Sequence, residues 1–269
     1  MWELLRYFKR EGDLKVILKD NYKHYPIIGW GIRGFQFIML ARNWAKDRKG
    51  LRQQLDVFKK DGFPLRLLIF PEGTTANTRD IAKSEKYAAA NGKPTYELLV
   101  VPRTTGFLAC VEALTSPIDR NDGGGGGGNG GANAGGNGKP VAASAAFATM
   151  PVVYDVTMAY EGYSGEIPTW EMGYGRAKDV ALPSLGKLLA GAPQRPVHLH
   201  IVRHPMVAAA ADGEAFVLRS WAKKEQLLQG FVKEGKFPGE PQRVLKPRPA
   251  VASFLLAMAL PLLAGEAVR

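Results

Sequence analysis

The feature that most constrains the fold is the stretch at residues 65–75, LRLLIFPEGTT, in which an apolar run stops at a Pro-Glu-Gly-Thr turn. Five of the six residues at 65–70 are apolar. This predicts a strand buried on both faces, because a half-buried strand would alternate polar and apolar residues. Pro71 has no N–H and Gly73 can adopt backbone angles closed to other residues, so the chain must turn sharply where the strand ends.

The turn after this strand carries the groups of an anion-binding site. Glu72 offers a carboxylate, Thr74 and Thr75 offer hydroxyls, and the turn leaves backbone N–H groups free. Amides at strand ends and helix starts hold phosphate in many proteins. The turn therefore predicts a site for an oxygen-rich headgroup, and the alternative is an ordinary loop with Glu72 in water.

A second apolar run, residues 96–102 (YELLVVP), also ends in Pro and is followed at once by Arg103. Residues 80–90 between the two runs are predicted to form a helix. Two strands joined through a helix make a βαβ unit whose carboxyl ends lie at the same edge of the sheet. We therefore expect one cleft to contain Glu72, Gly73, Thr74 and Arg103.

The rest of the pattern predicts an α/β fold with a mixed, mainly parallel sheet flanked by helices. Further strands are expected at residues 14–19, 35–40, 151–160 and 197–204, with a turn at 26–31. Amphipathic helices are expected at residues 44–60 and 216–231.

One α/β domain is expected from residues 1–120 and 139–238. Residues 121–138 have almost no side chain able to bury apolar area, and they are predicted to be a flexible Gly-rich insert. Residues 239–269 are a tail with an uncharged stretch at 250–265. At 1.5 Å per residue this stretch reaches about 24 Å, short of the bilayer core, so it is either part of a membrane-spanning segment or a membrane-surface helix.

The charge balance favours an anionic partner. Lys and Arg number 36 against 25 Asp and Glu, a formal net charge of +11, which suits a phospholipid surface, acyl-CoA or nucleic acid. Nucleic acid is disfavoured because no recognised binding motif accompanies the charge. Cys110 is the single cysteine; it excludes an intramolecular disulfide and lies in an apolar segment, where a buried side chain is expected rather than a nucleophile.

No metal site is expected. His198 and His200 fall on one face of a predicted strand, but no third ligand is suggested nearby. They are interpreted as lying at a solvated or headgroup-facing strand edge.

Three sequence blocks resemble the glycerolipid acyltransferase family, which acylates lysophosphatidic acid and related lysophospholipids. They are YPIIGWGIRGFQFIMLARNWAKD at residues 25–47, FPEGT at 70–74 and VPRTTGF at 101–107. The longer pattern is most similar to the lysocardiolipin and lysophosphatidylinositol acyltransferase branch. The resemblance covers most of residues 14–238, apart from the Gly-rich insert.

The resemblance implies acyl transfer from acyl-CoA, as co-substrate and without a cofactor, to a lysophospholipid hydroxyl. By the same resemblance Arg42 would bind the acceptor phosphate, together with the turn at Glu72, Gly73 and Thr74, and with Pro102 and Arg103 of the V-P-R block. Thr75 stands where the family usually has an Arg. Arg42 could instead be a surface residue near Asp47, and Pro102 a simple strand terminator.

The family's catalytic pair is a His followed five residues later by an Asp. None of the 4 histidines has an Asp at that position, so no catalytic residue is assigned and the pair is expected upstream of Met1. The chain is then expected to bind its substrate without turning it over. The alternative is a non-catalytic peripheral phospholipid-binding protein.

The expected partners are therefore a lysophospholipid, acyl-CoA and a membrane, but not nucleic acid. Residues 1–12 mix aromatic and basic side chains, which predicts either an interfacial segment or a packed first helix. No cleavable signal is evident. The resemblance implies a membrane-associated protein of the endoplasmic reticulum, facing the cytosol or lying in the interface.

Overall fold

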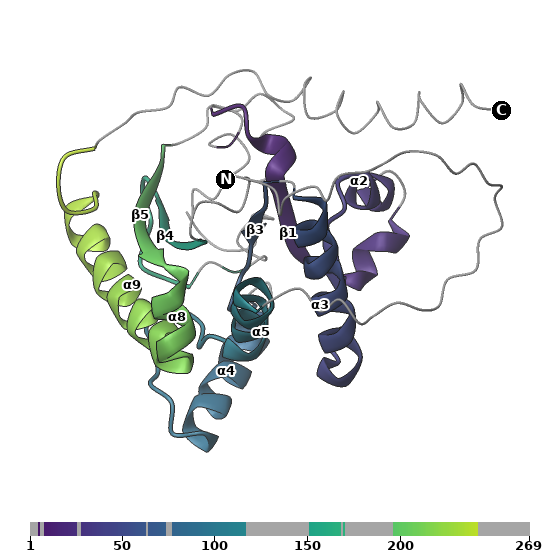
Figure 1. The fold of residues 1–269 in the computed structure, drawn as a ribbon. Helices are drawn as coiled ribbons and strands as arrows, with labels where there is room; N and C mark the ends of the chain where they lie inside the picture. The colour runs from purple at the N-terminus through teal and green to yellow at the C-terminus, as the bar shows by residue number, and fades with distance from the viewer. Residues whose placement is uncertain are drawn as a thin grey trace, which may run out of the picture.

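The computed structural model describes residues 5, 8–25, 28–62, 64–73, 77–116, 151–167, 169 and 196–241. Helices and strands alternate along most of this part of the chain (Figure 1). In chain order they are η1 (Glu11–Asp13), β1 (Leu14–Lys19), η2 (Asp20–His24), α2 (Ile28–Gly34), β2 (Ile38–Leu40), α3 (Trp44–Asp61), β3 (Arg66–Leu68), α4 (Thr78–Ala90), α5 (Thr104–Thr115), β4 (Val152–Tyr160), β5 (Val197–Pro205), α8 (Met206–Asp212) and α9 (Glu214–Glu234).

The first three strands form a parallel sheet in the order β2-β1-β3. Ile17 of β1 pairs with Ile38 of β2, and Val16 pairs with Leu68 of β3. Because all three strands run the same way, their carboxyl ends lie at one edge of the sheet. The α/β class and the parallel sheet expected from the sequence are confirmed.

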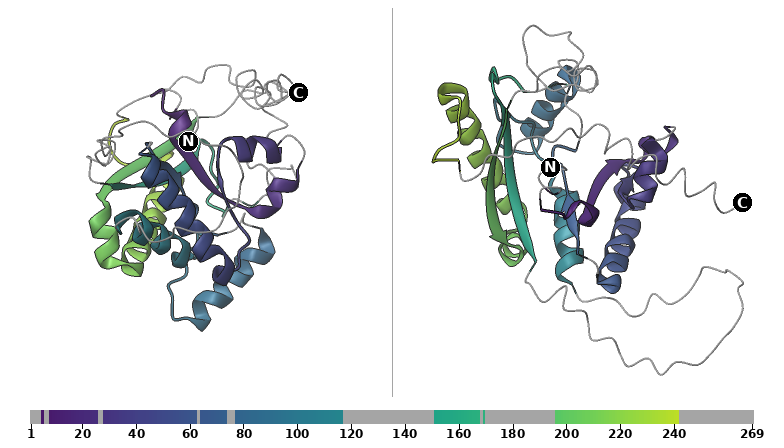
Figure 2. Two further views of the ribbon diagram at one scale, coloured as in Figure 1. Left: turned by 45° about the vertical axis from the view of Figure 1, so that its right-hand side comes forward. Right: turned by 90° about the horizontal axis from the view of Figure 1, so that it is seen from above.

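The last two strands form a separate antiparallel pair. β4 and β5 are in register from Val152 opposite Pro205 to Tyr160 opposite Val197. Helix α9 lies along this pair, and Figure 2 shows it on the outer side of the molecule. The described strands therefore form two sheets.

Two local expectations are wrong. Residues 96–102 are not a strand, since this segment pairs with none of the described strands and contains bends. The expected turn at residues 26–31 contains the start of α2 instead, because Gly29 donates its N–H to Tyr25 O at 2.8 Å and continues into helical bonding.

Both faces of the parallel sheet are covered by apolar side chains. Ile17 and Leu67 face the cluster that α3 and α5 form with β2, and Leu55 at its centre is fully buried. Val16 and Leu68 face a second cluster on the opposite side. This is the arrangement that the unbroken apolar strand patterns predict.

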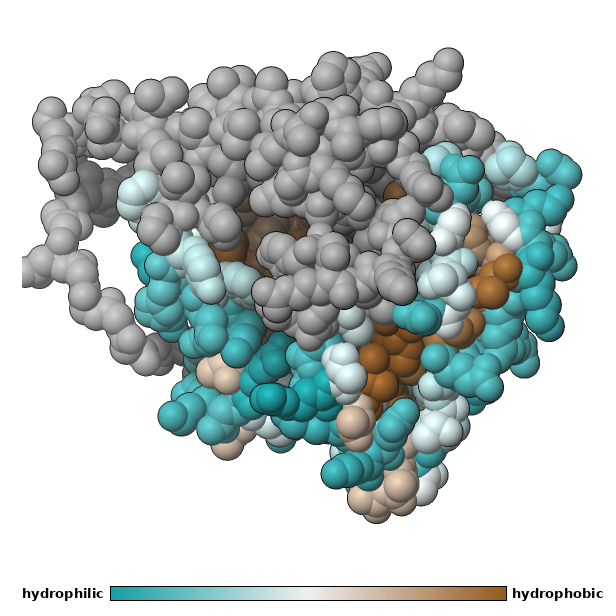
Figure 3. Space-filling model, turned by 180° about the vertical axis from the view of Figure 1, so that it is seen from behind, coloured by the Kyte–Doolittle hydropathy of each residue, from teal (hydrophilic) through white to brown (hydrophobic). Residues whose placement is uncertain are grey.

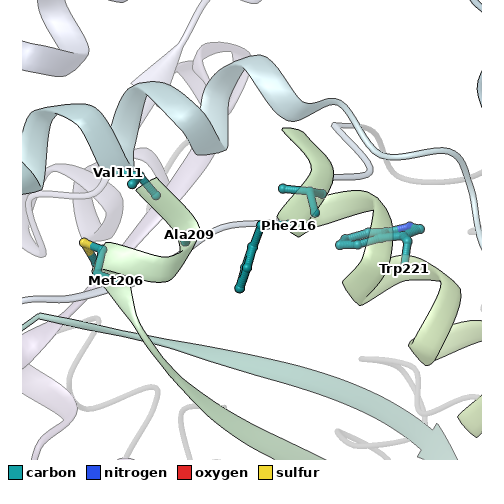
Figure 4. Close-up of a cluster of buried hydrophobic side chains, with 6 residues drawn as sticks. Val111, Met206, Ala209, Phe216 and Trp221 are labelled. Atoms are coloured by element: carbon teal, nitrogen blue, oxygen red, sulfur yellow. The ribbon is translucent and has the colours of Figure 1, made fainter. Parts of the chain in front are cut away.

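Helix α5 connects the two halves of the molecule. It contacts α3 on one side and α8 and α9 on the other, and Figure 2 shows it between them. Val111 of α5 packs against Met206, Ala209, Phe216 and Trp221 in one buried cluster (Figure 4). Among the described residues seen from behind, most of the surface is hydrophilic, with apolar patches between the polar side chains (Figure 3).

The predicted Gly-rich insert, the stretch at 250–265 and Thr74 lie outside the described residues. Within the described ranges, no helix has both the length and the apolar character needed to cross a bilayer.

Candidate functional site

The turn after β3 and the start of α5 are in direct contact. Gly73 closes the turn by donating its N–H to Phe70 O at 3.0 Å, and Arg103 donates its N–H to Pro71 O at 2.6 Å. Arg103 immediately precedes α5. The fold thus brings together two segments about thirty residues apart that carry the acyltransferase-like blocks.

Gly73 is required at the turn for two reasons. Its φ is +65°, a conformation that side-chain-bearing residues rarely adopt. A Cβ at this position would also lie 3.1 Å from Cγ of Arg103. The absent side chain therefore lets the Arg103 side chain pass directly beside the turn.

The guanidinium of Arg103 is exposed and rests on an aromatic ring. Its Cζ lies 4.0 Å from the ring centroid of Tyr87 on α4, a distance at which cation and ring attract each other. Within the described part of the chain it has no hydrogen bond or ion pair. Its five donors remain available for an oxyanion, which the planar guanidinium binds through paired hydrogen bonds.

The Glu72 carboxylate points into the protein. Its Oε2 atom is inaccessible to solvent and has no hydrogen-bond partner among the described residues. Burial raises the pKa of the Glu72 carboxyl, and a hydrogen bond to its own backbone together with the charge of Lys224 opposes that rise. The Glu72 carboxyl thus faces the interior rather than the exposed surface of the turn.

Lys224 is a buried cation on α9 that sequence reasoning missed. Its Nζ donates to Val156 O at 2.6 Å and forms an ion pair with Asp155, both on β4. The sequence did indicate that Lys224 is buried, because it lies at helical spacing from Trp221 and Leu228 on the buried face of α9. Lys224 ties α9 to β4 and also acts electrostatically on Glu72.

The segment before Arg103 is held by side chains instead of a neighbouring strand. Glu225 accepts hydrogen bonds from the N–H groups of Glu97 at 2.8 Å and Leu98 at 3.1 Å. Trp221 donates from Nε1 to Val100 O at 3.0 Å, and Ser84 Oγ accepts from Val101 N–H at 3.0 Å. Together these contacts satisfy the backbone of a buried segment.

Pro102 follows this segment directly and is itself fully buried. It has no N–H to leave unpaired, which suits the point where the side-chain contacts end. Pro102 is the last residue of the buried segment, and the next residue, Arg103, is exposed.

Arg42 lies in a strained loop at the carboxyl end of β2. Its φ is +62°, which is uncommon for a residue with a side chain. Asp47 holds this conformation, because its two carboxylate oxygens accept the N–H groups of Ala41 and Asn43, both at 2.9 Å. Strained backbone persists only where the surroundings enforce it, and it concentrates at functional sites.

Arg42 and Arg103 lie at the same edge of the parallel sheet. β1 separates β2 from β3, so the two outer strands are about 10 Å apart at the usual strand spacing. Arg42 follows β2 by two residues, and Arg103 is bonded to the turn after β3. Both side chains are exposed, and neither guanidinium has a hydrogen bond or ion pair among the described residues.

Three histidines of β5 pack against aromatic rings. The ring of His198 lies 5.1 Å from that of Phe231, and His204 lies 5.2 Å from Phe216. His200 lies 5.7 Å from Phe237. The interpretation of His198 and His200 as facing solvent or a headgroup missed this packing, because rings of α9 and of the residues after it lie against their face of β5.

The described residues contain no group of three or more His, Cys, Asp or Glu side chains that could hold a metal ion. Cys110 is buried in the α3–α5 cluster. Burial raises the pKa of its thiol to about 12. This thiol is protonated at neutral pH, which agrees with an inert packing role.

Two family models match the chain. Residues 1–118 match the model described as Acyltransferase, and residues 187–259 match the model described as Acyltransferase C-terminus. The fold and these matches define an acyltransferase-type α/β protein.

Curated relatives agree with the family models. A probable 1-acyl-sn-glycerol-3-phosphate acyltransferase 5 of Arabidopsis thaliana is 28% identical over 242 residues, covering 89% of this chain and 51% of the relative. Lysocardiolipin acyltransferase 1 of Danio rerio is 32% identical over 233 residues, which are 85% of this chain and 47% of the relative. Lysophosphatidylinositol acyltransferase 10 of Caenorhabditis elegans is 26% identical over 223 residues, which are 82% of this chain and 45% of the relative.

The chain belongs to the glycerolipid acyltransferase family. It spans about half the length of the curated relatives it matches. No solved structure matches it.

Proposed function

We propose that this chain carries the acceptor site of an enzyme that transfers a fatty acyl group from acyl-CoA to the free hydroxyl of a lysophospholipid. The observation that supports this most is the pair of exposed guanidinium groups, Arg42 and Arg103, at one edge of the sheet. A lysophospholipid phosphate offers the oxyanions that such groups bind. The relatives are named for acceptors of this class.

The residues described here would bind and orient the acceptor. Arg42 and Arg103 would hold the phosphate, and the glycine turn would let Arg103 approach it. Acyl transfer then requires a base to take the proton of the attacking hydroxyl as the bond to the thioester carbon forms and the CoA thiolate leaves. Because the acceptor is a membrane lipid, the reaction is proposed to take place at a membrane surface. Location at the endoplasmic reticulum is a prediction.

No histidine of this chain supplies that base. None of the 4 has an Asp five residues later, and three of them pack against aromatic rings. We propose that the His/Asp pair comes from sequence preceding residue 1, so that residues 1–269 bind the acceptor without acylating it.

To test whether acceptor binding and catalysis lie in different parts of the sequence, residues 1–269 are compared with a protein extended upstream to include a His/Asp pair. Release of free CoA from acyl-CoA is measured with lysophosphatidic acid, lysocardiolipin and lysophosphatidylinositol as acceptors. Activity is expected only for the extended protein. The contrary result is an extended protein that binds lysophospholipid but is inactive on every acceptor. This result would overturn the proposed enzymatic function and favour a peripheral phospholipid-binding protein.

The acceptor site is tested by titrating residues 1–269 with a short-chain lysophosphatidic acid and with an uncharged monoacylglycerol. Arg42→Gln and Arg103→Gln should each weaken phosphate binding about tenfold, because each removes a charge-assisted contact. Arg203→Gln, an exposed arginine on β5, is the matched control and should bind normally. Equal affinity of the wild type for the two lipids would contradict the phosphate site.

A further inference from the structure

A small helical unit at the carboxyl end of β1 exposes an unusual number of large aromatic side chains. This unit consists of η2, Tyr25 directly after it, and α2. Tyr22 is 40% exposed, Tyr25 54% and Trp30 53%. The rings of Tyr22 and Tyr25 lie 6.1 Å apart. Single exposed aromatics are ordinary on protein surfaces, but three within one short unit form a distinct surface.

The two helices of the unit are closely packed. Gly29 of α2 donates its N–H to Tyr25 O at 2.8 Å, and a Cβ at Gly29 would lie 2.3 Å from Lys23 O. Glycine therefore lets α2 lie directly against the backbone of η2. Ile32 of α2 is buried, which orients the unit on the domain.

Exposed cations lie at the start of α3. The first two turns of α3 carry the exposed side chains of Lys46, Arg48 and Lys49. Asp47 is the acidic residue of the same turns, and both its oxygens accept backbone N–H groups. Cations near a helix N-terminus are disfavoured by the helix dipole, so an anionic partner would explain their position there.

η2 and the start of α3 both lie at the sheet edge that carries Arg42. η2 begins at the residue after β1 and contacts β2, and α3 begins shortly after β2. Figure 1 shows α2 and α3 on the same side of the molecule. Exposed Trp and Tyr rings beside Lys and Arg are typical of surfaces that lie at the interface of a bilayer.

We propose that η2, α2 and the start of α3 form a docking surface for an anionic phospholipid bilayer. The aromatic rings enter the headgroup region, and Lys46, Arg48 and Lys49 pair with lipid phosphates. The surface lies at the same edge as Arg42, so docking presents the acceptor site to the bilayer. The inference goes beyond acyl transfer and is tested without it.

The experiment is sedimentation of residues 1–269 with vesicles. One vesicle is phosphatidylcholine alone and the other contains about 30% phosphatidylserine, an anionic lipid that attracts basic segments. The wild type should bind the anionic vesicle more tightly, and added salt should weaken this binding.

The aromatic part is tested with Y25A and W30A. Each should weaken binding to the anionic vesicle about tenfold, since an amphipathic ring is lost from the interface. W30F keeps an aromatic ring and should bind better than W30A. The matched control is Y154A on β4, because Tyr154 is 53% exposed, nearly the same as Tyr25, and should be without effect.

The charged part is tested with the double variant K46Q/K49Q. Two surface cations are removed, so binding to the anionic vesicle should fall roughly 20-fold while binding to the neutral vesicle is unchanged. The control is K83Q/K86Q, which removes two exposed lysines of α4. Circular dichroism confirms that each variant is folded.

Wild-type binding by folded Y25A and W30A would overturn the proposal, as would an equal loss in Y154A. Preference for a single-stranded oligonucleotide without vesicle binding, or self-association through these rings, would also overturn it. Titration with soluble short-chain lysophosphatidic acid needs no bilayer. It therefore distinguishes failure of the docking surface from failure of the acceptor site.

Discussion

Two segments of this chain share one sequence pattern but are held in different ways. Residues 65–71 and 96–102 are both apolar runs that end in Pro. The first contains β3, whose backbone pairs with β1. The second pairs with no strand in the part of the chain that the structure describes, and its N–H and C=O groups bond to side chains of α4 and α9.

This difference shows which parts of the chain hold Arg103 in position. The turn at Gly73 depends on a local backbone ladder, whereas the segment leading to Arg103 depends on Glu225 and Trp221, more than one hundred residues later. The two halves of the candidate site should therefore respond differently to mutation. Changes in α9 should reach Arg103, and changes in β3 side chains should not.

The largest effect is expected for Glu225→Ala. Glu225 is buried and accepts two backbone N–H groups, so its loss leaves both donors without a partner and should lower the free energy of unfolding by about 3 kcal/mol. Urea denaturation measures this. Glu234→Ala, at an exposed position of the same helix, is the control, and equal stability of the two variants would contradict the side-chain support of residues 96–102.

A smaller effect is expected for Ser84→Ala, which removes the acceptor of the buried Val101 N–H. The free energy of unfolding should fall by about 1 to 2 kcal/mol. In β3, Arg66→Ala should cost less than about 0.5 kcal/mol, because only a partly exposed ion pair with Asp13 is lost. If Arg66→Ala proved the more damaging, the contrast between the two segments would be wrong.

The stability that Glu72 contributes should depend on pH. Burial raises the pKa of Glu72, so the folded state binds this proton more tightly than the unfolded state. The stability that it contributes is present below its ordinary pKa of 4.5 and is lost as pH rises through the raised value. Glu72→Gln cannot titrate and should therefore gain stability relative to wild type across that window.

Urea denaturation at several pH values between about 4 and 8 measures this difference. Glu85→Gln, at an exposed position of α4, is the control and should show no such trend. A stability difference between Glu72→Gln and wild type that is constant with pH would show that the Glu72 pKa is not raised.

The smallest effect is expected for Tyr87, whose ring supports the Arg103 guanidinium. Tyr87→Leu should weaken binding of short-chain lysophosphatidic acid about threefold through loss of the cation–ring contact. Tyr87→Phe keeps the ring and should bind as wild type does. Equal weakening in both variants would show that the hydroxyl, not the ring, matters.

Much of the fold follows from local patterns that can be read without a structure. The helical spacing of Leu51 and Leu55 predicted α3 and its buried face, and both side chains are buried. The apolar run at residues 65–70 predicted a strand covered on both faces, and β3 has apolar neighbours on each. The blocks around Arg42, Gly73 and Arg103 indicated the family, which the family models confirm.

The errors arose where the partner of a segment had to be known. An apolar run does not show whether its N–H groups meet another strand or a buried carboxylate, so residues 96–102 were predicted as a strand. The alternation of His198 and His200 predicted one common face correctly, but not that Phe231 and Phe237 would cover it. Lys224 and Tyr87 were missed because their roles depend on groups distant in sequence.

The amino-acid sequence by itself determined the α/β class, the buried faces of the helices, the sharp turn at Gly73 and the family. These depend on periodicity and backbone restrictions that act over a few residues. Only the tertiary structure decided that α9 holds the segment before Arg103, that Glu72 points inward, and that Arg42 and Arg103 share a sheet edge. Such features depend on which distant groups meet, because a buried polar atom is stabilised by its partner wherever that partner lies in the chain.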